Sequence, residues 1–149
     1  MRILLDMDGI TVDFFGPLLA EYYKRTGEYV RLDQITEWDM GSNVTNKQAL
    51  FEIFHEPGFF ERLPPMPGAI KAIQELIHSG HEVVIVSSPC TSHAASEKIN
   101  WCKQYLPFID PKNNPNPYTL RAEGALDTCW SQIEHIIKLH SYSFRSVED

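Results

Sequence analysis

Two aspartates, Asp6 and Asp8, stand one residue apart at the end of the apolar run in the stretch RILLDMDGITVDF. Like charges at the end of a buried strand raise each other's pKa values and resist burial unless a cation offsets them. A hard ion such as Mg²⁺ takes one or two carboxylates and leaves positions for water and phosphate oxygens. With that charge offset, we expect Asp6 to attack phosphorus and Asp8 to exchange protons with the leaving alcohol and with water.

A second polar strand end comes roughly 80 residues later, where EVVIVSSP ends its apolar run in Ser87 and Ser88. Hydroxyl and backbone N–H groups of this kind bind phosphate. The carboxyl ends of parallel strands meet at one edge of a sheet, which is where such sheets bind ligands. We therefore expect these serines beside Asp6 and Asp8. The alternative left open is that both aspartates form a solvated turn or cap a helix.

Continuous apolar strands alternate with helices along the chain, a pattern typical of an α/β fold with a parallel sheet flanked by helices. Asp33 and Thr45 are cap signals for two or three short helices in the section before Pro57. The other expected elements are strands over 2–7, 82–86 and 118–121 and helices over 14–26, 67–79, 96–106 and 129–140.

The 149 residues, 43% of them hydrophobic, fit one compact domain over 1–149. Twenty acidic against thirteen basic residues give a formal net charge of -7, which argues against binding to a nucleic-acid polymer or to an anionic membrane. The apolar segment Ile3 to Leu5 is too short for a signal peptide, and no run has transmembrane length. Cys90, Cys102 and Cys129 lack metal-finger spacing, so we expect reduced thiols and a cytoplasmic location.

The motifs resemble those of a known superfamily. ILLDMDGITVDF resembles motif I of the haloacid-dehalogenase-like (HAD) phosphohydrolases, and EVVIVSSP resembles their motif II. Within that superfamily the chain is similar to the 5'(3')-deoxyribonucleotidases, because GFF at Gly58 to Phe60 and a PxPGA helix start at Pro65 to Ala69 follow the same opening. The resemblance covers about residues 2 to 112.

The resemblance implies a Mg²⁺-dependent phosphatase that works through an aspartyl-phosphate. Asp6 would be the nucleophile and a metal ligand, and Asp8 the general acid/base and a metal ligand through its backbone carbonyl. Ser87, with Ser88 beside it, would bind the phosphate.

The resemblance also implies a HAD-like sheet with a small helical cap inserted after motif I, here over about 15–63. The substrate would be a small phosphoester, a deoxyribonucleotide. Aromatic rings stack on bases, so the candidates for the base pocket are Trp38, Phe54, Phe59 and Phe60. Ordinary packing inside the cap is the alternative for each ring.

The motif III lysine and the motif IV acids of the family are not recognisable, and we expect the segment that would carry them to be missing. The groups nearby in the sequence that would substitute are Lys112, Asp110, Glu123 and Asp127. Without a fourth strand, one edge of the motif I strand needs cover from a loop, the tail or a second subunit. A homodimer is therefore one of three expected arrangements.

The leading hypothesis from the sequence is an enzyme that removes phosphate from (deoxy)nucleoside monophosphates. One alternative is a catalytically impaired relative that binds nucleotide or phosphate without turnover. A HAD phosphatase of a non-nucleotide substrate is the other, because the cap residues, and not the fold, set the substrate.

Overall fold

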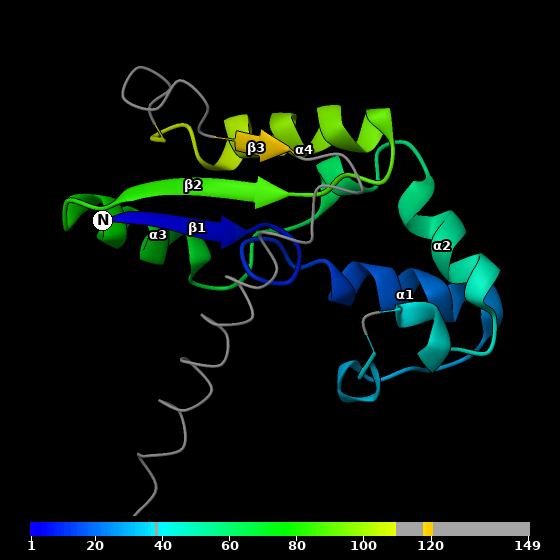
Figure 1. The fold of residues 1–149 in the computed structure, drawn as a ribbon. Helices are drawn as coiled ribbons and strands as arrows, with labels where there is room; N and C mark the ends of the chain where they lie inside the picture. Colours follow the sequence, from blue (N-terminus) through cyan, green and yellow to red (C-terminus); the bar gives the residue numbers. More distant parts are fainter. Residues whose placement is uncertain (38, 110–117, 121–149) are drawn as a thin grey trace, which may run out of the picture.

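Three parallel strands form the sheet, in the order β1-β2-β3. They are β1 (Arg2–Asp6), β2 (Glu82–Ser87) and β3 (Tyr118–Leu120). The computed structural model describes residues 1–37, 39–109 and 118–120. All three strands point the same way, and helices α1 and α2 lie beyond their carboxyl ends (Figure 1). The predicted α/β class and all three predicted strands are confirmed.

The two longer strands differ in how well they are covered. Val83, Val84 and Ile85 of β2 are buried, because β2 has a neighbour on each side. β1 was expected to be fully buried, but its Leu4 side chain is 43% exposed. The reason is that β1 is the edge strand of the sheet that the described residues form.

Helix α1 follows β1 as predicted and runs over Phe15–Thr26. It ends at Gly27, whose φ of +75° is a conformation that glycine adopts without strain. Four short elements come before the next long helix. They are η1 (Leu32–Gln34), η2 (Met40–Asn43), α2 (Lys47–His55) and η3 (Phe60–Arg62).

Two cap signals in this section were misplaced by a residue or two. Asp33 lies inside η1, whose N-cap is Arg31. Helix α2 takes its cap from Asn46, whose side chain accepts a hydrogen bond from the Ala49 N–H, and Thr45 lies one residue earlier. Threonine and asparagine both cap helices well, so the residue type alone does not decide between Thr45 and Asn46.

Two further helices flank β2 in the sequence. Helix α3 (Ala69–His78) buries Ile73, and helix α4 (Ser92–Tyr105) begins four residues before its predicted start. The Thr91 hydroxyl accepts a hydrogen bond from the Ala94 N–H, and this cap starts α4 early. Within the described ranges, no helix is both long and apolar enough to cross a membrane. Cys129 and the predicted closing helix lie outside the described residues.

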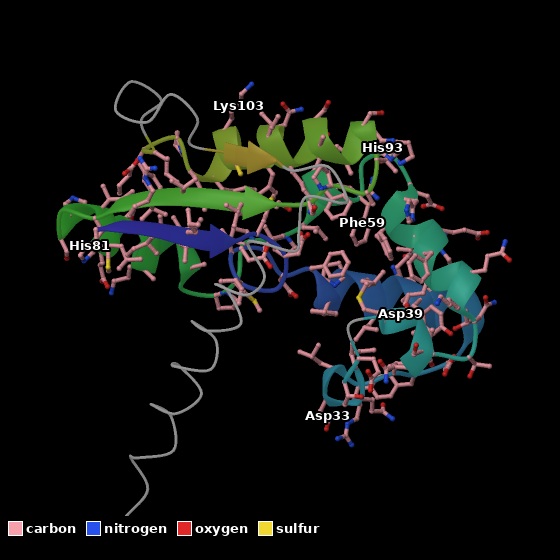
Figure 2. All side chains as sticks on the ribbon, viewed as in Figure 1. Asp33, Asp39, Phe59, His81, His93 and Lys103 are labelled. Atoms are coloured by element: carbon pink, nitrogen blue, oxygen red, sulfur yellow. The ribbon has the colours of Figure 1, made fainter. Side chains whose placement is uncertain are left out.

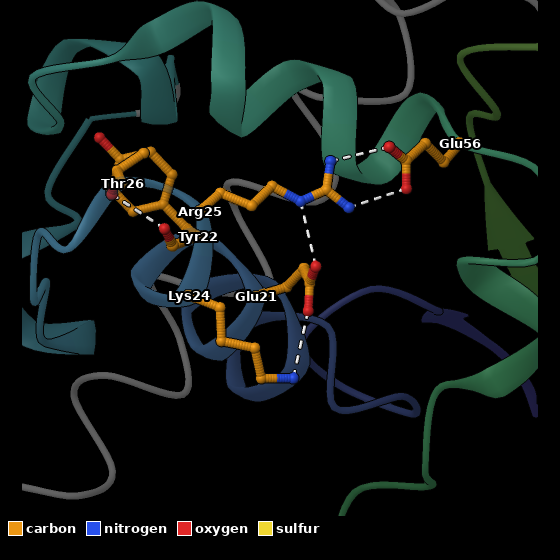
Figure 3. Close-up of polar contacts among 6 residues, drawn as sticks. All are labelled: Glu21, Tyr22, Lys24, Arg25, Thr26 and Glu56. Atoms are coloured by element: carbon orange, nitrogen blue, oxygen red, sulfur yellow. Dashed lines mark hydrogen bonds and ion pairs between the residues drawn. The ribbon is translucent and has the colours of Figure 1, made fainter.

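Helices α1 and α2 are joined by an exposed ion-pair network (Figure 3). The Arg25 guanidinium donates to both carboxylate oxygens of Glu56 at 2.7 and 2.9 Å and to Glu21 at 3.0 Å. Such exposed pairs add little to stability, so they orient the two helices more than they hold them together.

A buried tyrosine makes a second link between the same helices. The Tyr22 hydroxyl is fully buried, donates to Glu28 at 2.5 Å and accepts from the Asn46 N–H at 3.0 Å. Glu28 in turn accepts from the Thr45 hydroxyl at 2.9 Å. This network fixes the N-terminus of α2 against the C-terminal turn of α1.

We predict that Tyr22→Phe lowers the free energy of unfolding by about 1–3 kcal/mol, because the Asn46 N–H loses its buried acceptor. Tyr23→Phe is the matched control, since Tyr23 lies on the same helix and is 51% exposed. Its change should stay within about 0.5 kcal/mol. Urea denaturation measures both, and equal effects would contradict the role of the network.

A pH dependence follows from the same network. The pKa of Glu28 is lowered, chiefly by the hydrogen bond from Tyr22 and then by those from Thr45. A carboxylate whose pKa is lower in the folded state than in the unfolded state stabilises the fold above about pH 4.3. This contribution to the free energy of unfolding is lost as the pH falls through the folded pKa. The stability difference between the wild type and Tyr22→Phe should therefore narrow below about pH 4. Urea denaturation at a series of pH values measures it, and a constant gap would contradict it.

Candidate active site

The polar ends of β1 and β2 lie side by side, as predicted. Asp6 is in register with Val86, and the Met7 N–H donates to the Val86 carbonyl at 3.2 Å. Asp6 and Ser87 thus end neighbouring strands at the same edge of the sheet.

The turn after β1 fixes where Asp8 lies. Gly9 has a φ of +78°, which favours glycine, and its N–H donates to the Val12 carbonyl at 2.9 Å. The buried Thr11 hydroxyl donates to the Asp6 carbonyl at 2.9 Å, and the Thr11 N–H donates to the Met7 carbonyl at 3.0 Å. These bonds fold the chain back on the strand end and hold both aspartates in one rigid turn.

A lysine from α4 completes this cluster. Lys98 is 1% exposed, and its ammonium donates to Asp8 Oδ2 and, at 2.7 Å, to Ser87 Oγ. One buried cation therefore connects β1, β2 and α4.

The residues predicted from the sequence to replace the family's lysine and acids do not include Lys98. Lys112, Asp110, Glu123 and Asp127 lie outside the described residues. The cation that the structure places against Asp8 is Lys98, which was not among the residues predicted for the site. The helical spacing of Ala94, Lys98, Trp101, Cys102 and Tyr105 was the available signal, because it puts a charge on the apolar face of a helix.

The electrostatics of the cluster centre on Asp6. Burial raises the pKa of Asp6, and the neighbouring Asp8 charge raises it further. The Met7 N–H, which donates to Asp6 Oδ1 at 2.7 Å, and the Lys98 charge act against both effects. Asp6 is thus a partly desolvated carboxylate whose charge is offset in part by the nearby Lys98.

The residues present fit a hard divalent cation. Asp8 Oδ1 is buried and has no hydrogen-bond partner among the described residues, so it has a free lone pair for a ligand. Together with Asp6 it places two carboxylates at this turn, and a Mg²⁺ ion bound beside them would offset their charge while backbone carbonyl, water and substrate phosphate oxygens filled its other positions. In the described part of the chain, no group of three or more His, Cys, Asp or Glu side chains could hold a metal.

The predicted pocket aromatics form one buried cluster. Phe54, Phe59 and Phe60 are 7%, 5% and 3% exposed, and their ring centroids lie 5.9, 5.9 and 6.1 Å from that of Phe14. Figure 2 shows Phe59 between the strand ends and α2. The Phe60 ring centroid is 4.4 Å from the Lys98 ammonium, so the cluster adjoins the carboxylates. Trp38 lies outside the described residues, and Ser88 is half-buried next to Ser87.

Comparisons with known proteins agree with one another. Residues 1–115 match the model of a family described as "5' nucleotidase, deoxy (Pyrimidine), cytosolic type C protein". A putative 5'(3')-deoxyribonucleotidase of Bordetella pertussis is 34% identical over 112 residues, which cover 71% of this chain and 60% of that protein. The human 5'(3')-deoxyribonucleotidase, cytosolic type, is 32% identical over 118 residues, which cover 71% of this chain and 58% of that protein. The chain thus spans about three fifths of the length of these relatives.

The two partners of the buried ion pair should respond differently to substitution. Asp8→Asn leaves the buried Lys98 ammonium without its carboxylate and should lower the free energy of unfolding by about 3 kcal/mol. Lys98→Met should change it by less than about 1 kcal/mol, because the Asp8 side chain is 30% exposed and water can solvate it. Urea denaturation of the metal-free protein measures both. A larger loss in Lys98→Met than in Asp8→Asn would contradict the pairing.

Proposed function

The chain belongs to the family of deoxy (pyrimidine) 5' nucleotidases of cytosolic type C, and we propose that it removes the phosphate from (deoxy)nucleoside monophosphates. The single observation that carries this proposal is the placement of Lys98 against Asp8 and Ser87, beside the desolvated Asp6. A cation, a hydroxyl and two carboxylates, gathered at the carboxyl ends of neighbouring strands, are the groups that a phosphoryl transfer needs. The names of the relatives support the nucleotide as substrate.

Asp6 is the proposed nucleophile. Its oxygen forms a bond to phosphorus while the ester P–O bond breaks, and the electron pair of that bond leaves on the alcohol oxygen. In the substrate complex Lys98 turns from the Asp8 carboxylate to the phosphoryl oxygens, and Asp8, then protonated, gives its proton to the alcohol oxygen. Asp8, now a carboxylate, takes a proton from a water whose oxygen attacks the same phosphorus, while the Asp6 O–P bond breaks and its electron pair returns to the Asp6 carboxylate. Phosphate leaves, and both side chains return to their starting states.

Lys98 and the serines hold the phosphoryl oxygens in this proposal. The Lys98 ammonium compensates the charge of the nucleophile and of the phosphoryl group, and its contact with Ser87 keeps the hydroxyl in place. Ser88 follows on the same strand end and adds polar groups to the same edge. Because the cation is buried, its field is screened little by water.

Asp6 and Asp8, the latter through its backbone carbonyl, are the residues that would hold Mg²⁺. When bound, the ion would neutralise repulsion between the carboxylates and an anionic substrate. The cytosolic type of the human relative is consistent with a cytoplasmic location, which we include in the proposal.

The segment 15–63 is the proposed cap over the nucleotide. It contains α1 and α2, which lie beyond the carboxyl ends of the strands (Figure 1). Its ring cluster of Phe54, Phe59 and Phe60 adjoins Lys98 and is the proposed wall of the base pocket, together with Trp38.

The test is a phosphatase assay with Mg²⁺ on a panel of deoxynucleoside and ribonucleoside monophosphates and on sugar phosphates. We predict that Asp6→Asn lowers kcat/KM by at least about 10³-fold and that Lys98→Met lowers it by about 10²–10³-fold. Asp33→Asn, an exposed aspartate on η1, is the matched control and should leave the rate unchanged.

Two outcomes would overturn parts of the proposal. Wild-type turnover no faster than that of Asp6→Asn on every substrate would leave a nucleotide- or phosphate-binding relative. Hydrolysis of sugar phosphates without hydrolysis of nucleotides would exclude the base pocket and keep the phosphatase.

A further inference from the structure

Glu97 is a buried carboxylate that the proposed chemistry does not use. It is 7% exposed and precedes Lys98 on α4, but it contacts a different part of the molecule. Its Oε1 accepts from the Gly58 N–H at 2.5 Å, and its Oε2 accepts from the Phe60 N–H at 3.1 Å. Both carboxylate oxygens are therefore bound to one short segment, Gly58–Phe60.

Backbone amides alone hold this charge within the described residues, where no lysine, arginine or histidine lies within ion-pair distance of Glu97. Burying a carboxylate is costly, and an apolar side chain at this helical position would pack without that cost. A carboxylate between two amides is useful when the amides must be held in one place, because charge-assisted hydrogen bonds are short and strong.

The backbone of the segment is shaped for this contact. Gly58 has a φ of +86°, which favours glycine and turns its N–H toward α4. The N–H of Phe59, between the two bound amides, instead donates to the Glu56 carbonyl at 3.3 Å. One turn along α4, the buried Trp101 indole donates to the Leu63 carbonyl at 2.7 Å. Two successive turns of helix α4 thus make hydrogen bonds to the end of the 15–63 segment.

The same segment contacts the site from its other side. The Phe60 ring faces the Lys98 ammonium, and Phe60 and Phe59 pack edge to face at 5.2 Å within the cluster around Phe14. Adjacent residues of α4 therefore do two things: Lys98 binds the Asp8 carboxylate, and Glu97 fixes the segment whose ring lies against Lys98.

We propose that Glu97 is a positioning residue that holds Gly58–Phe60 in place and thereby sets the fit of the nucleoside end of the substrate, while the phosphate end is bound independently. The proposal rests on the proposed function for its substrate. The contact itself does not, because it is a property of the fold.

Hydrogen exchange tests the contact without any assay of activity. In the wild type the amides of Gly58 and Phe60 should be protected. In Glu97→Gln, which keeps the shape but loses one acceptor and the charge, at least one of them should exchange about tenfold faster or more. The amides in the middle of α4 should not change. Glu61→Gln is the matched control, since Glu61 lies in the next turn of chain and is exposed.

Kinetics test the positioning. The KM for a nucleoside monophosphate should rise about tenfold in Glu97→Gln. The reason is that Gly58–Phe60, the segment proposed to fit the nucleoside end, loses one charge-assisted hydrogen bond that holds it in place. The inhibition constant of inorganic phosphate should stay within about twofold, because Asp6, Ser87 and Lys98 are intact. A purely structural loss would instead lower kcat for every substrate and leave KM unchanged, since it only reduces the folded fraction. If Glu97→Gln does not fold, Gly58→Ala makes the same test from the segment side.

Each outcome decides one claim. Unchanged exchange at Gly58 and Phe60 would overturn the contact. Faster exchange with an unchanged KM, or with an equal loss of phosphate binding, would overturn the positioning role. A wild type that hydrolyses no nucleotide would overturn the proposed function only, and calorimetric binding of a nucleoside monophosphate and of phosphate would then replace the kinetic constants.

Discussion

The buried ammonium of Lys98 is the interaction on which the arrangement of the site depends. It lies between Asp8 from the turn after β1 and Ser87 from the end of β2, and its own helix packs beside both. A charge at 1% exposure is tolerated only when its partners are in place, so the pair couples the position of α4 to that of the strand ends. The desolvation that makes the pair costly also raises the pKa of Asp6 and makes each charge in the cluster act at short range.

The elements that carry the site could be predicted from apolar spacing and from glycine. Buried strands and helix C-termini leave local signals in a sequence. The apolar runs predict β1 and β2, and the glycine after α1 predicts where that helix ends. The meeting of the two strand ends followed from parallel topology. The start of α4 could not be predicted from the sequence, because Thr91 and its neighbours offer several N-cap residues of similar quality.

The spacing of Lys98 indicates a charge on the apolar face of its helix, but the partners of Lys98 and of Glu97 could not be identified from the sequence. A charged pair in the middle of a helix normally faces solvent, and only the identity of its distant partners makes burial favourable. Those partners, Asp8 and the amides of Gly58 and Phe60, lie about 90 and 37–39 residues away along the chain. The exposure of Leu4 likewise depends on which strands flank β1, a property of the whole sheet.

The most direct test of the account is a crystal structure of the protein with Mg²⁺ and beryllium trifluoride, which mimics a phosphoryl group on a carboxylate. We predict that the beryllium atom is bonded to an Asp6 oxygen and that the Lys98 ammonium and the Ser87 hydroxyl contact its fluorines. An anion bound elsewhere, or bound at Asp6 while Lys98 still contacts only Asp8 and Ser87, would contradict the assignment of these strand ends as a phosphoryl site.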